Sequence, residues 1–173
     1  MSENRKYEFH WGLLGNMEIG RPNLGNKVPV EVYRLMQFTF RDVFEQVLGA
    51  DKTDEMFYEA GKLAGTFFYK NVLCPSADIN EYIRELQRAL KEYGIGILRV
   101  EKADLEKGEI VLTVSEDLDC SGMPEQDIEI CKYDEGFISG LLESFLGTPF
   151  FVKEVDCWCT GDRVCRFHAK VVR

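Results

Sequence analysis

Residues 157–165 read CWCTGDRVC and lie between two runs in which apolar and polar residues alternate. The middle of this stretch, TGDR, has the composition of a tight turn, and the alternation on either side is typical of β-strands. We therefore predict a β-hairpin built from residues 150–157 and 164–172. Cys157 and Cys165 then face each other across the hairpin, and thiolates placed at hairpin ends are natural ligands for zinc.

A second hairpin is predicted upstream, from residues 95–100 and 110–114, which are apolar runs joined by a polar segment. Helices are predicted where apolar residues recur at steps of three and four positions. They are residues 29–48, 53–72, 78–93 and 133–146. Because the strands come as hairpins and do not alternate with helices, the predicted class is α+β, with an antiparallel sheet of about four strands and about four helices packed on one side.

Small residues recur one turn apart within two of these helices. Residues 60–61 and 64–65 are both Ala-Gly, and Gly136 and Gly140 follow the same spacing in the last helix. This pattern lets another helix backbone or a flat ligand come close, and helix packing is the favoured interpretation, although each glycine costs helix stability by roughly 0.8–1 kcal/mol. Thr53 is expected to cap the start of the second helix.

The length and composition indicate a single core. A chain of 173 residues with 45% hydrophobic content can bury one core and is too short for two ordinary domains. Residues 1–26, which glycines and a proline interrupt, are interpreted as an N-terminal arm docked on a single domain of residues 27–173. The first residues are polar, and no apolar stretch is long enough for a signal peptide or a membrane span. We therefore expect a cytoplasmic protein with no membrane partner.

The charge and the residue inventory exclude several functions. A formal net charge of -9 argues against direct nucleic-acid binding, because contact with phosphates needs clustered Lys and Arg. The acidic residues around the first hairpin, among them Asp117 and Asp119, are expected to form a solvated surface. No Ser-His-Asp constellation and no flavin or nicotinamide fingerprint is recognised. The sequence thus favours binding over catalysis.

Six cysteines in a reducing compartment are expected to be metal ligands, buried small residues or redox groups, and not structural disulfides. Cys131, Cys157 and Cys165 are the main candidates for a structural zinc site, since zinc prefers several thiolates in a closed tetrahedron. The ion would join the last helix to the terminal hairpin.

Several segments of the chain, taken in order, resemble the 4-vinyl reductase domain family. They are residues 20–25 (GRPNLG), 28–35 (VPVEVYRL), 60–65 (AGKLAG), 133–137 (YDEGF) and 157–167 (CWCTGDRVCRF). The resemblance covers essentially the whole chain. It implies an α+β ligand-binding fold that is shared with subunits of the TRAPP vesicle-tethering complex and with haem-based nitric oxide sensors.

The resemblance also implies a function. The family includes sensor domains of bacterial activators that respond to phenol and related aromatics, and a protein tied to bacteriochlorophyll synthesis; its shared element is a pocket for small, mostly apolar molecules. We therefore expect a sensor or carrier domain that binds an apolar or aromatic ligand without catalytic turnover. Two alternatives remain open: an enzyme or chaperone acting on a vinyl-bearing tetrapyrrole, and a TRAPP-like dimeric scaffold without a ligand.

A ligand set for zinc follows from the same resemblance. In the aromatic-responsive sensors, zinc lies below the pocket on a cysteine that is followed downstream by Glu-x2-Cys-x7-Cys. Glu154, Cys157 and Cys165 reproduce that spacing, and Cys131 lies upstream. In a regular strand Glu154 and Cys157 point to opposite faces, so both can bind one ion only across a bulge or bend. Either Glu154 or Cys120, which lies in a polar loop, completes the predicted site.

The fold implied by the resemblance places a ligand pocket between the helices and the sheet. The expected lining residues are Ile110, Phe137, Leu141, Val152, Phe67 and Phe68. The family analogy further predicts a homodimer. The first long helix supports this prediction, because its apolar residues are spread so widely, as at Phe38, Phe40 and Phe44, that they cannot all face one side.

Overall fold

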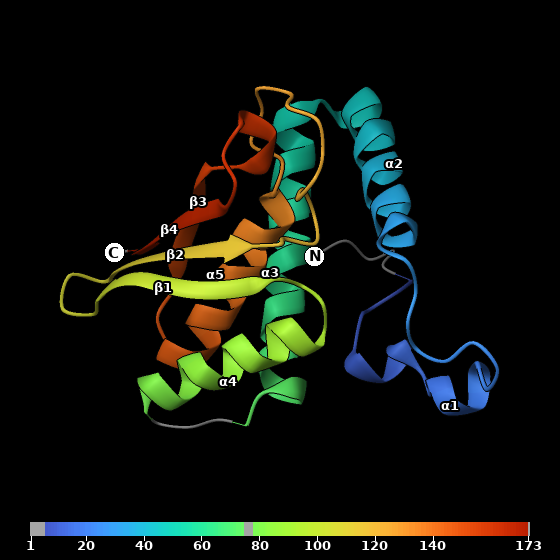
Figure 1. Ribbon diagram of the computed structural model, residues 1–173, viewed down its shortest axis with the longest axis horizontal. Helices are drawn as coiled ribbons and strands as arrows, with labels where there is room; N and C mark the ends of the chain where they lie inside the picture. Colours follow the sequence, from blue (N-terminus) through green and yellow to red (C-terminus); the bar gives the residue numbers. More distant parts are fainter. Residues whose placement is uncertain (1–5, 75–77, 173) are drawn as a thin grey trace.

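The computed structural model describes residues 6–74 and 78–172. In this part of the chain the helices are α1 (Met17–Gly20), α2 (Val30–Leu48), α3 (Ala50–Val72), α4 (Ile79–Glu92) and α5 (Lys132–Leu146). The strands are β1 (Ile97–Asp104), β2 (Glu109–Ser115), β3 (Phe150–Asp156) and β4 (Cys165–Val171), and short 3-10 turns span Trp11–Leu14 and Trp158–Thr160. The predicted α+β class is confirmed (Figure 1).

The four strands form one antiparallel sheet in the order β1-β2-β4-β3. Both predicted hairpins are present, and β2 pairs with β4 in the middle of the sheet, where Val114 lies opposite Cys165. The register between β3 and β4 shifts between Glu154 and Asp156, which marks a bulge. An extra residue at a bulge turns the following side chains to the other face of the strand. The bulge therefore changes which face the end of β3 presents to the core.

The helices form two layers on one side of the sheet. Helix α5 lies next to the strands, and α3 packs along its outer side (Figure 1). Gly65 of α3 meets the backbone of Phe137, and Gly140 of α5 meets the backbone of Lys62. The small residues thus serve helix-against-helix packing, which is the favoured interpretation of their spacing. Helix α4 packs against β1 and closes the other end of the core.

The start of α3 differs from the prediction. Gly49 ends α2 with a φ of 83° and α3 begins at Ala50, so a single residue separates the two helices. Thr53 is not the N-cap: it lies inside the first turn, is fully buried, and donates its hydroxyl to the carbonyl of Gly49 at 2.9 Å. Glycine accommodates this positive φ without the strain that a side chain would add.

Helix α2 stands at the side of the molecule, as Figure 1 shows, with its polar face turned inward. Gln37 is the buried residue of this helix. Arg34 donates to the carbonyls of Leu118 and Ser121, and Arg41 pairs with Asp54 of α3. The large apolar side chains of α2 are mostly exposed. They include Val30, Val32, Leu35, Met36, Phe40, Val43, Val47 and Leu48.

The predicted N-terminal arm contacts the body of the protein through aromatic residues. Phe9 meets Phe67 of α3 edge to face, with ring centroids 5.1 Å apart, and Trp11 packs against the core. The first five residues of the predicted arm lie outside the described residues. Among the helices that the structure describes, none is long and apolar enough to cross a membrane.

Candidate metal centre and ligand cavity

Four cysteines from four different segments meet at one end of the sheet. Cys120 lies in the loop after β2, Cys131 precedes α5, Cys157 follows β3 and Cys165 begins β4. Their Sγ atoms all lie within 4.8 Å of one another. The nearest pairs are Cys120–Cys165 at 3.1 Å, Cys131–Cys157 and Cys131–Cys165 at 3.9 Å, and Cys120–Cys157 at 4.0 Å. We call this group the cysteine site.

The cysteine site is dry, reduced and strongly coupled. All four residues are at most 1% exposed, and none forms a disulfide. The pKa of Cys157 is held far below its usual value, because the thiols of Cys120, Cys131 and Cys165 donate toward its sulfur. The pKa of Cys131 is raised, because its thiol is hydrogen-bonded first to Cys120 and then to Cys157 and Cys165. A thiolate among thiols is the arrangement expected of a site that exchanges protons for a metal ion.

Glu154 lies beside the cysteine site but does not belong to the four-sulfur group. Its side chain is fully buried, and its Oε2 accepts from the backbone amide of Cys131 at 3.3 Å. Its Oε1 has no hydrogen-bond partner among the described residues. Burial and then the negative charge of Cys157 raise the pKa of Glu154 to about 9. The bulge after Glu154 allows both this residue and Cys157 to point into the protein.

The remaining two cysteines lie outside the group. Cys159 is buried in the 3-10 turn between β3 and β4, and its carbonyl accepts from the amide of Gln126 at 2.9 Å. Cys74 is exposed. Neither residue approaches the four sulfurs closely enough to join the cysteine site.

Three buried carboxylates line the inner side of the cysteine site. Asp117, Asp119 and Asp134 are 3%, 2% and 9% exposed, so the prediction of a solvated surface is wrong for Asp117 and Asp119. Asp117 accepts from the backbone amides of Asp119 and Cys120 at 2.8 and 3.1 Å, which positions Cys120. Asp119 accepts from the Tyr33 hydroxyl at 2.7 Å and from the Gln37 amide at 2.6 Å.

Asp134 has a different environment from the other two carboxylates. Its Oδ2 finds no hydrogen-bond partner within residues 6–74 and 78–172. Burial, followed by the charges of Asp119 and Asp117, raises the pKa of Asp134 well above its ordinary value. Burial and the charge of Asp119 likewise raise the pKa of Asp117 to about 7. These three carboxylates therefore cannot all carry a full charge at neutral pH without a compensating cation.

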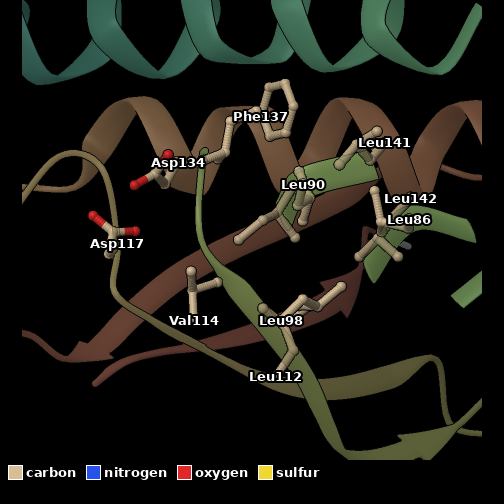
Figure 2. A pocket seen from close by; sticks show the side chains of 12 residues that line it. Leu86, Leu90, Leu98, Leu112, Val114, Asp117, Asp134, Phe137, Leu141 and Leu142 are labelled. Atoms are coloured by element: carbon tan, nitrogen blue, oxygen red, sulfur yellow. The ribbon is translucent and has the colours of Figure 1, made fainter. Parts of the chain in front are cut away.

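Two cavities share Ile95, Asp134 and Phe137 as lining residues. The larger one, of about 500 Å³, lies between the N-terminal arm, α3 and α5. We call it the aromatic cavity, because its lining includes Phe9, Trp11, Tyr33, Phe67, Phe68, Tyr93, Tyr133 and Phe137. The smaller one, of about 40 Å³, lies under α5 and is lined mainly by leucines, with Asp117 and Asp134 at one end (Figure 2).

The residues predicted to line a pocket fall into different places. Phe67, Phe68 and Phe137 line the aromatic cavity, and Leu141 lines the smaller leucine-rich one. Ile110 lines a separate cavity of about 30 Å³ beneath α4. Val152 is fully buried in β3 and lines none of these cavities. The contribution of the N-terminal arm was missed, although the cluster of Phe9 and Trp11 within its first residues was a visible signal.

The fold and the sites define an α+β domain of the type found in small-molecule sensor proteins. Residues 110–171, which run from β2 to β4, match the family model of the 4-vinyl reductase domain. The chain therefore carries a 4-vinyl reductase domain, and the resemblance seen in its sequence is confirmed. The matched segment contains all four residues of the cysteine site.

Relatives of known sequence span nearly the same length as this chain. The uncharacterized protein MJ1642 of Methanocaldococcus jannaschii is 26% identical over 149 residues, which cover 86% of this chain and 81% of the relative. The uncharacterized protein MJ0150 of the same organism is also 26% identical, over 148 residues that cover 86% of this chain and 79% of the relative.

Solved structures share the fold at low sequence identity. A vinyl-4-reductase family protein from Methanocaldococcus jannaschii has a TM-score of 0.59 at 20% identity, over 86% of this chain and 85% of that one. The phenol-responsive sensory domain of the transcription activator PoxR, solved with phenol, has a TM-score of 0.60 at 12% identity, over 83% and 75%. A trafficking protein particle complex subunit 3 from Naegleria fowleri, covalently bound to palmitic acid, has a TM-score of 0.56 at 16% identity, over 81% and 95%.

Proposed function

We propose that this protein is a sensor or carrier domain that binds a small apolar or aromatic molecule in the aromatic cavity. The volume of that cavity, about 500 Å³, carries the proposal. It lies within the range of roughly 300–1,000 Å³ that is typical of small-molecule sites. Tyr93 and Leu14, which are 57% and 48% exposed, lie at its lining and leave a path for entry from solvent.

Two of the structural neighbours support this choice of ligand class. PoxR was solved with phenol and the trafficking subunit with palmitic acid, so the fold accommodates both aromatic and long-chain apolar molecules. The aromatic cavity of this chain is lined almost wholly by apolar and aromatic side chains, with Asp119 and Asp134 as its charged residues. Burial of apolar ligand surface against such side chains supplies the main binding free energy.

The proposal can be tested with a neutral apolar dye and a variant that fills the cavity. N-phenyl-1-naphthylamine should bind the purified protein saturably, and native mass spectrometry should show any mass retained from the cell. Ala64 lines the cavity, so Ala64→Trp should weaken dye binding by at least about tenfold, which is 1.4 kcal/mol. Ala50→Trp, on the exposed first residue of the same helix, is the matched control.

Equal dye affinity in the Ala64→Trp and Ala50→Trp variants would show that the dye binds elsewhere. Absence of both retained mass and saturable dye binding would contradict the proposal as a whole.

We also propose that the cysteine site binds a structural zinc ion. In a tetrahedron with zinc–sulfur bonds of 2.3 Å, neighbouring sulfurs lie about 3.8 Å apart. The four nearest sulfur pairs of the cysteine site lie between 3.1 and 4.0 Å, so the thiols are already spaced for one small tetrahedral ion. An iron–sulfur cluster places several atoms between its thiolates and needs a wider arrangement. Four thiolates also leave no open position, which favours a structural role over catalysis.

In this arrangement Cys120 is the fourth ligand and Glu154 is a supporting residue. The Glu154 carboxylate accepts from the Cys131 amide and so orients the segment that carries the Cys131 thiol. Zinc would then join the loop after β2, the start of α5 and the ends of β3 and β4. Five buried, unpaired cysteines also suit a reducing compartment, and on this basis we place the protein in the cytoplasm.

A second copy of this chain is the proposed partner of α2. The inward face of this helix is polar and bonded to the body of the protein, whereas its outward face carries eight exposed apolar residues. Contiguous apolar patches on the surface of a soluble protein mark interaction sites. Two such helices, each with an apolar stripe along its length, complement each other in a symmetric dimer.

A further inference from the structure

The aromatic cavity contains an unsatisfied carboxylate. Asp134 lines both the aromatic cavity and the leucine-rich cavity, and it is only 9% exposed. Its Oδ2 has no hydrogen-bond donor within the described chain. Figure 2 shows the side chains of Asp117 and Asp134 at the same end of the smaller cavity, away from the leucines. A buried carboxylate oxygen without a donor carries a desolvation penalty that a bound donor would remove.

The neighbouring carboxylates do not share this deficiency. Asp117 accepts two backbone amides, and Asp119 accepts the Tyr33 hydroxyl and the Gln37 amide. Arg34, the nearest guanidinium on α2, is occupied by the carbonyls of Leu118 and Ser121. Among the described residues that line the aromatic cavity there is no Lys, Arg or His. Asp134 therefore faces the cavity without a cation from the protein itself.

Aromatic rings surround the space next to Asp134. Tyr33, Tyr133, Phe137 and Trp11 all line the same cavity as Asp134. A ring face carries a partial negative charge and attracts an ammonium group within about 6 Å. A carboxylate together with several aromatic rings is a combination that recognises organic cations, since it supplies both charge-assisted hydrogen bonds and cation–π contacts.

We propose that the ligand of the aromatic cavity is an apolar or aromatic molecule that carries a protonated amine. The amine binds Asp134 Oδ2, and the apolar body lies against the rings of the arm and of α3. This inference rests on the proposed function, because it names the head group of the molecule that the cavity binds. It goes beyond that function in assigning Asp134 as the residue that selects the ligand.

Other head groups match the cavity less well. A ligand carboxylate would add a negative charge next to Asp117, Asp119 and Asp134, and like charges at this range repel strongly in a dry site. A hydroxyl could donate one hydrogen bond to Asp134 but would bring no positive charge. An ammonium group supplies several donors and the missing charge together. We therefore expect the order of affinity to be amine, then alcohol, then carboxylate.

The experiment uses four probes that share one naphthalene ring and differ only in the head group. They are 1-naphthylmethylamine, 1-naphthalenemethanol, 1-naphthylacetate and 1-methylnaphthalene, each titrated by calorimetry into the full-length, metal-loaded protein. We expect the amine to bind at least about tenfold more tightly than 1-methylnaphthalene, as a charge-assisted hydrogen bond allows. We expect the acetate to bind more weakly than 1-methylnaphthalene.

A variant then assigns the selectivity to Asp134. Asp134→Asn keeps the size of the side chain and should remove the advantage of the amine while leaving the affinity for 1-methylnaphthalene unchanged. Asp42→Asn, on the exposed face of α2, removes the same charge far from the cavity lining and should keep the amine advantage. Metal content and thermal unfolding of both variants show whether the fold is intact. If Asp134→Asn does not fold, the four probes on the unmodified protein still decide the head-group preference.

Each outcome separates this inference from the proposed function. If 1-methylnaphthalene binds but the amine has no advantage, or if the alcohol or the acetate binds best, the inference is wrong and the apolar cavity stands. If the amine advantage survives in a folded Asp134→Asn variant, Asp134 is not the selecting residue. If none of the four probes binds, the proposed function fails together with the inference.

Discussion

Gly61 of α3 lies directly against the carbonyl oxygen of Tyr133 in α5, with no room for even one further carbon atom between the two helices. A Cβ on Gly61 would overlap that oxygen and would lie 2.9 Å from the amide nitrogen of Phe137. Gly136 has the reciprocal relation to the carbonyl of Tyr58. The two helices are therefore held at backbone contact, and α5, which carries Cys131 and Asp134 at its start, is positioned by this contact.

We expect Gly61→Ala to destabilise the protein, because neither backbone can move without separating α3 from α5. Overpacking of this kind costs about 1–3 kcal/mol, and this outweighs the roughly 0.8–1 kcal/mol that alanine gains in a helix. Chemical denaturation measures the change. Gly20→Ala is the matched control, since no atom lies within 4 Å of a Cβ at that position. An unchanged midpoint in Gly61→Ala would contradict the close contact.

The contact between α3 and α5 could be predicted because its signal is local: small residues recur one turn apart in each helix. The start of α3 could not be predicted in the same way. A threonine that caps a helix and a threonine that donates back to the carbonyl four residues earlier occur in similar sequences. Thr53 belongs to the second kind because Gly49 lets α3 follow α2 without a loop.

The second prediction concerns the proposed zinc. Cys165→Ser should remove the ion, because the remaining three thiolates and a hydroxyl form a much poorer site. A ligand present at about 1,000 times its Kd stabilises the folded state by about 4.1 kcal/mol, so loss of zinc should lower the unfolding free energy by at least this order. Metal analysis and thermal unfolding on the same sample measure both effects.

Cys74→Ser and Cys159→Ser are the matched controls for this experiment. Cys74 is exposed, and Cys159 is buried but lies outside the cysteine site. Both variants should retain zinc, and a chelator should bring the melting temperature of the native protein down to that of Cys165→Ser. Native protein without metal, when purified in the absence of chelator, would exclude a zinc site.

The third prediction distinguishes Cys120 from Glu154 as the fourth ligand. Cys120→Ser should lose zinc or bind it far more weakly, whereas Glu154→Gln should keep it, since the Gln oxygen can still accept from the Cys131 amide. The glutamine also remains uncharged in its buried position, so its cost in stability should be small. Zinc lost from Glu154→Gln and retained by Cys120→Ser would reverse the assignment.

The sequence pattern found three of the four cysteines and left the fourth ligand open, for a physical reason. Cys120 reaches the site only because Asp117 shapes its loop and because Asp119 is bonded to Tyr33 and Gln37, which lie 86 and 82 residues away in the chain. The same long-range contacts bury these two aspartates. In sequence they stand in an acidic segment that resembles a solvated surface, so neither their burial nor the role of Asp134 could be foreseen.

The last prediction tests the dimer proposed for α2. Leu35 is 69% exposed on the apolar stripe of this helix, opposite the face on which Arg34 and Gln37 bond to the body of the protein. Leu35→Lys places a charge in the proposed interface and keeps the helix propensity, so it should convert a dimer to a monomer without unfolding the chain. Light scattering on the eluting peak of a size-exclusion column gives the mass, and circular dichroism monitors the fold. Leu105→Lys, at a leucine that is 48% exposed in the loop between β1 and β2, is the matched control and should remain dimeric. A native protein that is monomeric at micromolar concentration, or a Leu35→Lys variant that stays dimeric, would show that a second copy does not cover this face.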